Sequence, residues 1–161
     1  MISNNSHDPE KLLVSACLLG QPVRYDGKSK GLTDIDWLQE LERQQRLVVL
    51  CPEVAGGLAI PRPAAEINGE LVIASTGDDV TAAFRLGALE ALALCKLHKI
   101  KYALLKAKSP SCGNQQIYDG TFSGQLTSGM GLTARLLSEN GIRVFSELQL
   151  DELQREFKVQ N

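Results

Sequence analysis

Three cysteines of this chain each follow a short apolar segment of the kind that forms a buried β-strand. Cys17 and Cys51 come directly after such segments, and Cys112 follows a third one after a short loop. The carboxyl ends of parallel strands meet at one edge of a sheet, and ligands bind in the crevice there. We therefore expect these three thiols, although far apart in the sequence, to converge in space.

Three converging thiolates have the chemistry of a soft metal site. Cysteine thiolates suit zinc or an iron–sulfur cluster, and a 4Fe-4S cluster normally takes four of them. If only three are supplied, one iron lacks a protein ligand and can bind a substrate as a Lewis acid. The alternative is that these cysteines are free thiols packed under loops. Their spacing alone leaves both interpretations open.

The fourth cysteine, Cys95, differs from the other three. It lies within a long helical pattern, on the apolar side, so we expect a small core residue there. The chain has no CxxC pair, which argues against a zinc ribbon or a thioredoxin-type redox site. Disulfides are rare in reducing compartments, so we also expect no structural disulfide.

Polar side chains next to the cysteines are candidates for moving protons. Glu53 follows Cys51 by two residues, and Ser109 and Ser111 precede Cys112. A carboxylate and a hydroxyl beside a metal site of low dielectric constant could shuttle protons for an attacking water. The alternative is structural: Glu53 pairs with an arginine, and the serines cap a turn.

The elements that must position these residues follow from the apolar pattern. Strands are predicted over 11–16, 46–50, 102–105 and 142–145. Helices are predicted over about 35–45, 78–98, 132–139 and 148–159, the first of them capped by Asp34. Asn68-Gly69 predicts a hairpin turn. The alternation of strands and helices predicts an α/β fold, a Rossmann-like three-layer sandwich around a mainly parallel sheet.

Length and composition limit the classes of protein to consider. The 161 residues are 43% hydrophobic, which predicts one domain over 1–161, with a polar lead-in at 1–10. The net charge is −2 and basic residues are scattered, so duplex nucleic acid is not an expected partner. No apolar run reaches the roughly 20 residues of a membrane helix, and no signal peptide is visible. We expect a cytoplasmic protein.

Six motifs in a fixed order then identify a family that the chain resembles. They are ACLLGQPVRYDG, CPEVAGGLAIPR, TGDDVT followed by FRLGA, LLKAKSPSCG, IYDGTFSG and GIRVFSE. Together they resemble the small bacterial thiouracil desulfidases, long catalogued as a domain of unknown function. The match spans roughly residues 12–147, and an ordered six-part match is far more specific than any one motif.

The resemblance implies a cofactor and a reaction. It implies a 4Fe-4S cluster bound by Cys17, Cys51 and Cys112, with one open iron, and removal of sulfur from a thiolated uracil without net redox change. The thiocarbonyl sulfur would bind the open iron, water would attack the ring carbon, and the sulfur would leave as hydrogen sulfide. Glu53 and Ser109 are the expected proton-handling pair, with Ser111 the second choice. The expected partner is a small thiolated nucleobase or nucleoside.

Two other classes share the three cysteines. One is a cluster-bearing sensor or assembly protein without catalysis, which needs no pocket for a heterocycle. The other is a zinc-dependent hydrolase that uses the same thiolates and a water. The sequence does not decide between 2-thio and 4-thio substrates, between free base and nucleoside, or between oligomeric states.

Overall fold

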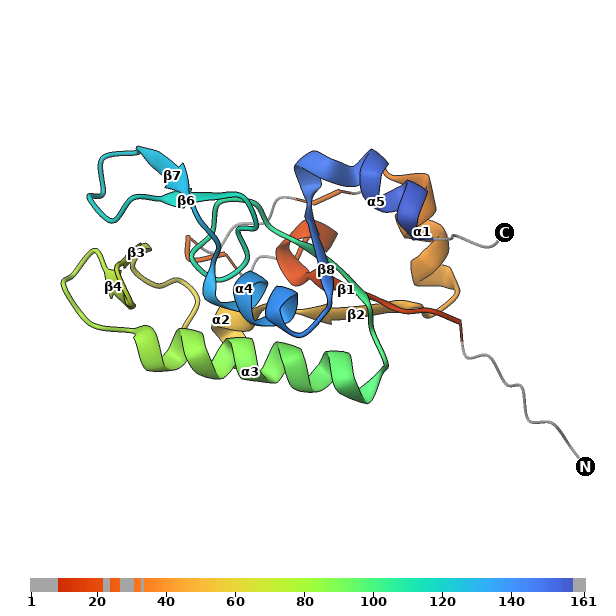
Figure 1. Cartoon of the computed structure of the whole chain (residues 1–161), viewed down its shortest axis with the longest axis horizontal. Helices are drawn as coiled ribbons and strands as arrows, with labels where there is room; N and C mark the ends of the chain where they lie inside the picture. The colour runs from red at the N-terminus through yellow and green to blue at the C-terminus, as the bar shows by residue number, and fades with distance from the viewer. Residues whose placement is uncertain (1–8, 22–23, 27–30, 33, 158–161) are drawn as a thin grey trace, which may run out of the picture.

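A computed structural model describes residues 9–21, 24–26, 31–32 and 34–157 (Figure 1). Most of the polar lead-in (1–8) and the end of the last predicted helix (158–159) lie outside these residues. The centre is a parallel sheet of four strands in the order β2-β1-β5-β8. The strands are β1 (Leu12–Ser15), β2 (Leu47–Leu50), β5 (Tyr102–Leu105) and β8 (Arg143–Ser146). In register, Leu12 pairs with Leu47 on one side and Tyr102 on the other.

Helices cover both faces of this sheet, as the three-layer prediction requires. They are α1 (Asp36–Arg43), α3 (Thr81–Leu97), α4 (Leu132–Glu139) and α5 (Leu150–Glu156). Because successive strand residues point to opposite faces, Leu13 packs in a core with α3 and α4, whereas Leu12 and Val14 pack in another with α1 and α5. Figure 1 shows α3 and α4 on one side of the sheet and α1 and α5 on the other. The predicted fold class is confirmed.

Two small hairpins lie beyond the end of the sheet where β1 and β2 finish (Figure 1). The first consists of β3 (Ala65–Asn68) and β4 (Leu71–Ala74) and confirms the predicted hairpin, although its turn residues are Gly69 and Glu70, because Asn68 still pairs with Leu71. The second consists of β6 (Gln116–Tyr118) and β7 (Leu126–Ser128). Glu66 connects the two hairpins, since its Oε1 accepts hydrogen bonds from the backbone N–H groups of Gly120 and Phe122.

Several local predictions need correction. Asp34 does not cap α1: Ile35 holds the N-cap position and makes no side-chain cap hydrogen bond. The last predicted helix is divided into a 3₁₀ turn, η2 (Glu147–Gln149), and α5. A four-residue helix, α2 (Pro52–Ala55), and the β6–β7 hairpin were not predicted. Both elements are too short, and β7 too exposed, to show an apolar period.

Candidate functional site

The three predicted cysteines follow three neighbouring strands of the sheet. Cys51 follows β2, Cys17 lies in a 3₁₀ turn, η1 (Ala16–Leu19), directly after β1, and Cys112 follows β5. Because the strand order is β2-β1-β5, these positions lie side by side at the carboxyl edge. Cys17 and Cys112 are buried and Cys51 is partly exposed. No disulfide joins the four cysteines, all of which lie in the described part of the chain.

The environment of the buried thiols disfavours their charged form in the protein alone. Burial, followed by the charge of Cys51, raises the pKa of Cys17 from its ordinary value of 9.0 to about 11. Burial raises the pKa of Cys112 to about 12, although hydrogen bonds from Ser111 and Ser15 oppose the rise. Deprotonation of these thiols therefore needs a strong compensating partner, such as a metal or a cluster.

Cys95 lies apart from the other cysteines. It occupies the buried face of α3, in the core that packs against the sheet, and is 1% exposed. Burial raises the pKa of its thiol to about 11. The prediction that Cys95 is a core residue is confirmed.

Glu53 lies in the first turn of α2 and faces two partners. Its Oε2 accepts a hydrogen bond from Ser111 Oγ at 3.1 Å. Its Oε1 lies 3.2 Å from Arg62 Nε, in an ion pair whose side chains are 16% and 5% exposed. Arg62 Nη1 also donates to the carbonyl of Ala59 at 3.0 Å. The carboxylate is therefore held between a guanidinium and the segment that contains Cys112.

The two serines are connected to Glu53 in series. Ser109 Oγ accepts hydrogen bonds from the backbone N–H of Cys112, at 2.7 Å, and of Ser111, at 3.2 Å. Ser109 Oγ also lies 3.1 Å from Ser111 Oγ. A hydroxyl has two acceptor lone pairs and one hydrogen. With both lone pairs of Ser109 engaged, its hydrogen points to Ser111, and the hydrogen of Ser111 is then available to Glu53.

Both alternatives considered for these polar residues occur together. Glu53 pairs with an arginine and Ser109 caps a turn, as a structural role requires. The same groups also form a continuous chain of hydrogen bonds, Ser109–Ser111–Glu53. Ser111, the less favoured serine on sequence grounds, is the direct partner of Glu53, and Ser109 reaches it through Ser111.

Close backbone contacts fix the segments that bear these residues. A Cβ on Gly87 of α3 would lie 2.0 Å from the carbonyl oxygen of Pro52, and one on Gly56 would lie 2.0 Å from that of Ala83. A Cβ on Gly131 would lie 2.4 Å from the carbonyl carbon of Ser111. Glycine at these positions lets α2 and the cysteine loop approach neighbouring backbone closely.

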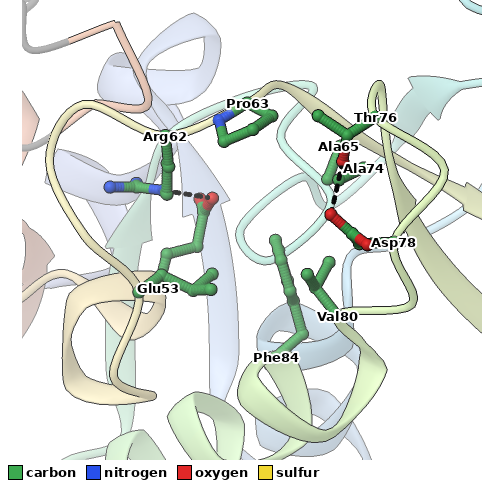
Figure 2. A pocket seen from close by; sticks show the side chains of 10 residues that line it. Glu53, Arg62, Pro63, Ala65, Ala74, Thr76, Asp78, Val80 and Phe84 are labelled. Carbon is green, nitrogen blue, oxygen red and sulfur yellow. Dashed lines mark hydrogen bonds and ion pairs between the residues drawn. The ribbon is translucent and has the colours of Figure 1, made fainter.

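A cavity of about 80 Å³ borders Glu53. Figure 2 shows Glu53 and Arg62 at one end, Thr76 and Asp78 at the other, and the ring of Phe84 between them. Apolar side chains line most of the remaining wall: Leu58, Pro63, Ala65, Ala74 and Val80. Its volume exceeds the roughly 30 Å³ that a water molecule occupies in the liquid. Water therefore has room beside the carboxylate.

Three residues at this edge were missed by the sequence analysis. Lys106 and Glu147 form an ion pair, with 2.8 Å between Nζ and Oε2, and their side chains are 18% and 8% exposed. Ser15, at the end of β1, lies 3.5 Å from Cys112 Sγ. Lys106 directly follows β5 and Glu147 directly follows β8. The strand-end rule that identified the cysteines also applies to these positions.

The described residues contain neither a site for a single metal ion nor a membrane-spanning helix. No three His, Cys, Asp or Glu side chains among them converge closely enough to bind one metal ion. Within the same residues, no helix has both the length and the apolar character needed to cross a membrane.

Comparison with known proteins identifies the family of this chain. The model of the 2-thiouracil desulfurase family matches residues 12–149. The protein YbbK of Bacillus subtilis (strain 168), described as uncharacterized, is 38% identical over 152 residues, covering 88% of this chain and 99% of YbbK. A solved structure named as the 4Fe-4S-dependent thiouracil desulfidase TudS is 55% identical. It has a TM-score of 0.89 and covers 91% of this chain and 97% of its own. The chain therefore belongs to the 2-thiouracil desulfurase family, a family of enzymes.

Proposed function

We propose that this chain removes sulfur from a thiolated uracil, of the 2-thiouracil or 4-thiouracil type, and releases it as hydrogen sulfide. A 4Fe-4S cluster bound by Cys17, Cys51 and Cys112 would be the cofactor. The main support is that these cysteines follow three neighbouring strands in a member of the 2-thiouracil desulfurase family. The 55% identical neighbour is named as a 4Fe-4S-dependent enzyme of this activity.

The residues at the sheet edge fit such a cluster. Each thiolate of a 4Fe-4S cluster binds its own iron, so the three sulfurs need not converge on one ion. The hydroxyl of Ser15 lies 3.5 Å from Cys112 Sγ, where it can donate to a thiolate, and Ser111 Oγ lies 3.4 Å from the same sulfur. Hydrogen bonds of this kind are typical of cluster sulfurs. The partial exposure of Cys51 leaves one side of the site accessible.

When bound, a cluster with one iron that lacks a protein ligand supplies a Lewis acid to which a soft thiocarbonyl sulfur can bind. The side chains provide the remaining chemistry. Glu53 is the proposed general base that accepts a proton from the attacking water, because its carboxylate borders both the cavity and the cysteine loop. Arg62 keeps this carboxylate in place through its ion pair.

Ser109 and Ser111 complete the proposed proton path. The hydrogen bonds of the pair run from Ser109 through Ser111 to Glu53, so protons can move between the carboxylate and the outer hydroxyl. Ser111 is 1% exposed, whereas Ser109 is only partly buried, so Ser109 is the serine of the pair that lies nearer the surface. Glu53 and Ser109 thus remain the proposed catalytic pair, with Ser111 as the connection.

The overall reaction balances without a reductant. Water supplies the oxygen that replaces sulfur on the ring carbon, and its two hydrogens leave with the sulfur as hydrogen sulfide. No atom changes its net oxidation state. We also propose that the substrate is a small molecule rather than a whole nucleic acid, because a net charge of −2 provides little attraction for a polyanion.

Anaerobically reconstituted protein provides the direct test. Incubation with 2-thiouracil or 4-thiouracil, without reductant, should give uracil and sulfide in equal amounts, measured by chromatography and colorimetric sulfide assay. Brown protein with about four irons per chain that releases no sulfide from either compound would favour a sensor or assembly role. Colourless protein with one zinc would instead support the hydrolase.

A further inference from the structure

A largely buried ion pair lies at the same edge of the sheet as the cysteines and does not belong to the proposed proton path. Lys106 Nζ contacts Glu147 Oε2 at 2.8 Å and also donates to the carbonyl of Ala107. The other oxygen of Glu147 accepts a hydrogen bond from the backbone N–H of Ala107 at 2.6 Å. Breaking a buried pair of this kind destabilises a protein, whereas keeping it adds little net stability. This pair therefore needs an explanation beyond stability.

The strand order places Lys106 between Cys17 and Glu147. Lys106 follows β5, which lies between β1, the strand before Cys17, and β8, the strand before Glu147. Lys106 therefore extends from the strand next to that of Cys17, and Glu147 holds its ammonium from the β8 side. A positive charge beside a buried thiolate offsets part of its desolvation.

Lys106 also acts on Cys112, through Ser15. The backbone N–H of Lys106 donates to Ser15 Oγ at 3.0 Å, which occupies an acceptor position of that hydroxyl. The hydrogen of Ser15 is then directed to Cys112 Sγ, 3.5 Å away. Ser15 is 2% exposed, so no bulk water competes for its hydrogen. One residue of the β5 end thus influences two of the three cysteines.

We propose that Lys106, held by Glu147, and Ser15 are positioning residues that set the reduction potential and the retention of the cluster. This proposal rests on the cluster of the proposed function, but not on the desulfuration step. A nearby positive charge and hydrogen bonds to sulfur both stabilise the reduced, more negative cluster, and therefore raise its potential.

The test measures the midpoint potential of the reconstituted cluster by spectroelectrochemistry and its rate of iron loss to a chelator. Lys106→Met and Ser15→Ala should each lower the potential and speed iron loss, whereas Lys106→Arg should change neither. In the double variant Lys106→Met/Glu147→Gln both charges are absent, so its potential should lie between wild type and Lys106→Met. Ser15→Ala changes no charge and leaves the ion pair intact, which keeps the test informative if Lys106→Met does not fold.

The matched control is Lys96→Met. Lys96 is exposed on α3, near the end that leads into the start of β5, at the opposite edge of the sheet. Its removal takes away the same charge and should leave the potential unchanged. Potentials equal to wild type in both Lys106→Met and Ser15→Ala would overturn the inference. A cluster that responds as expected in a protein without desulfidase activity would instead refute only the proposed function.

Discussion

Ser111 Oγ donates a hydrogen bond to Glu53 Oε2 at 3.1 Å, although the two residues are 58 positions apart in the sequence. Ser111 immediately precedes Cys112, and Glu53 follows Cys51 by two residues. This bond therefore joins the segments that present two of the three proposed cluster ligands. It also places the carboxylate beside the sulfur of Cys112, since Ser111 Oγ lies 3.4 Å from Cys112 Sγ.

Replacing Glu53 by Gln tests its role in proton transfer. The amide keeps the shape of the carboxylate and can still accept from Ser111, but it cannot accept a proton from water. We expect normal iron content and a fall in sulfide release of about 10²- to 10⁴-fold, the usual contribution of a general base. Glu139→Gln, at the exposed end of α4, is the control. Unchanged turnover in Glu53→Gln would remove Glu53 from the mechanism.

The two serines should differ in what their loss does. Ser111→Ala interrupts the path between Ser109 and Glu53, so turnover should fall while the cluster is retained. Ser109→Ala also removes the acceptor of the buried Cys112 N–H, and should lower the free energy of unfolding by about 1–3 kcal/mol. Steady-state kinetics and denaturant titration measure both effects.

Thr133→Val is the matched control for loss of a buried hydroxyl. Thr133 Oγ1 is buried without a hydrogen-bond partner among the described residues, at the start of α4. Its replacement should therefore be neutral or slightly stabilising. A serine variant with full turnover and wild-type stability would contradict the proposed path.

Alanine substitution of each cysteine separates ligands from core residues. Cys17→Ala, Cys51→Ala and Cys112→Ala should each give protein with little iron and no visible absorption after reconstitution. Cys95→Ala should retain both, at a cost in stability on the order of 1 kcal/mol, because it removes one small buried group from the core on α3. Iron loss in Cys95→Ala but not in Cys51→Ala would reassign the ligand set.

The sheet and the position of the cysteines could be predicted because both depend on local patterns. Four short apolar runs predicted the four strands, and Asn68-Gly69 predicted the β3–β4 hairpin to within one residue of its turn. The strand order was not needed to place Cys17, Cys51 and Cys112 at one edge, since every strand of a parallel sheet ends there. The helical period alone identified Cys95 as a core residue and not as a candidate ligand.

The partners of the polar residues could not be predicted, because they depend on distant segments. The sequence offered two serines near Cys112, but only the fold shows that Ser111, not Ser109, contacts Glu53 directly. Likewise, the pairing of Lys106 with Glu147 depends on β5 and β8 being neighbours. The short helix α2 was missed because four residues around a proline have no detectable period.

The contact between α2 and α3 predicts a strong effect of Gly87→Ala. The added Cβ would meet the carbonyl oxygen of Pro52 at 2.0 Å, so α2 must shift away from α3. Overpacking of this kind costs about 1–3 kcal/mol, measurable by denaturant titration. Because α2 contains Glu53 and follows Cys51, iron content and turnover should fall as well. Ala93→Ser, exposed on the same helix, should change none of these quantities appreciably.

The buried thiols predict a pH dependence of stability in the protein without its cluster. Folding raises the pKa of Cys17 from 9.0 to about 11 and that of Cys112 to about 12. The folded state therefore holds these protons more tightly, and the resulting stability is complete below pH 9 and is lost as pH rises through 11 to 12. Urea unfolding midpoints in the presence of a disulfide reductant should fall between pH 8 and pH 11. The unfolding midpoint of the double variant Cys17→Ala/Cys112→Ala should fall less over the same pH range. In that variant only the groups that both proteins share, such as lysines, still titrate. If the unfolding midpoints of the two proteins fell equally, neither thiol would be buried in its protonated form.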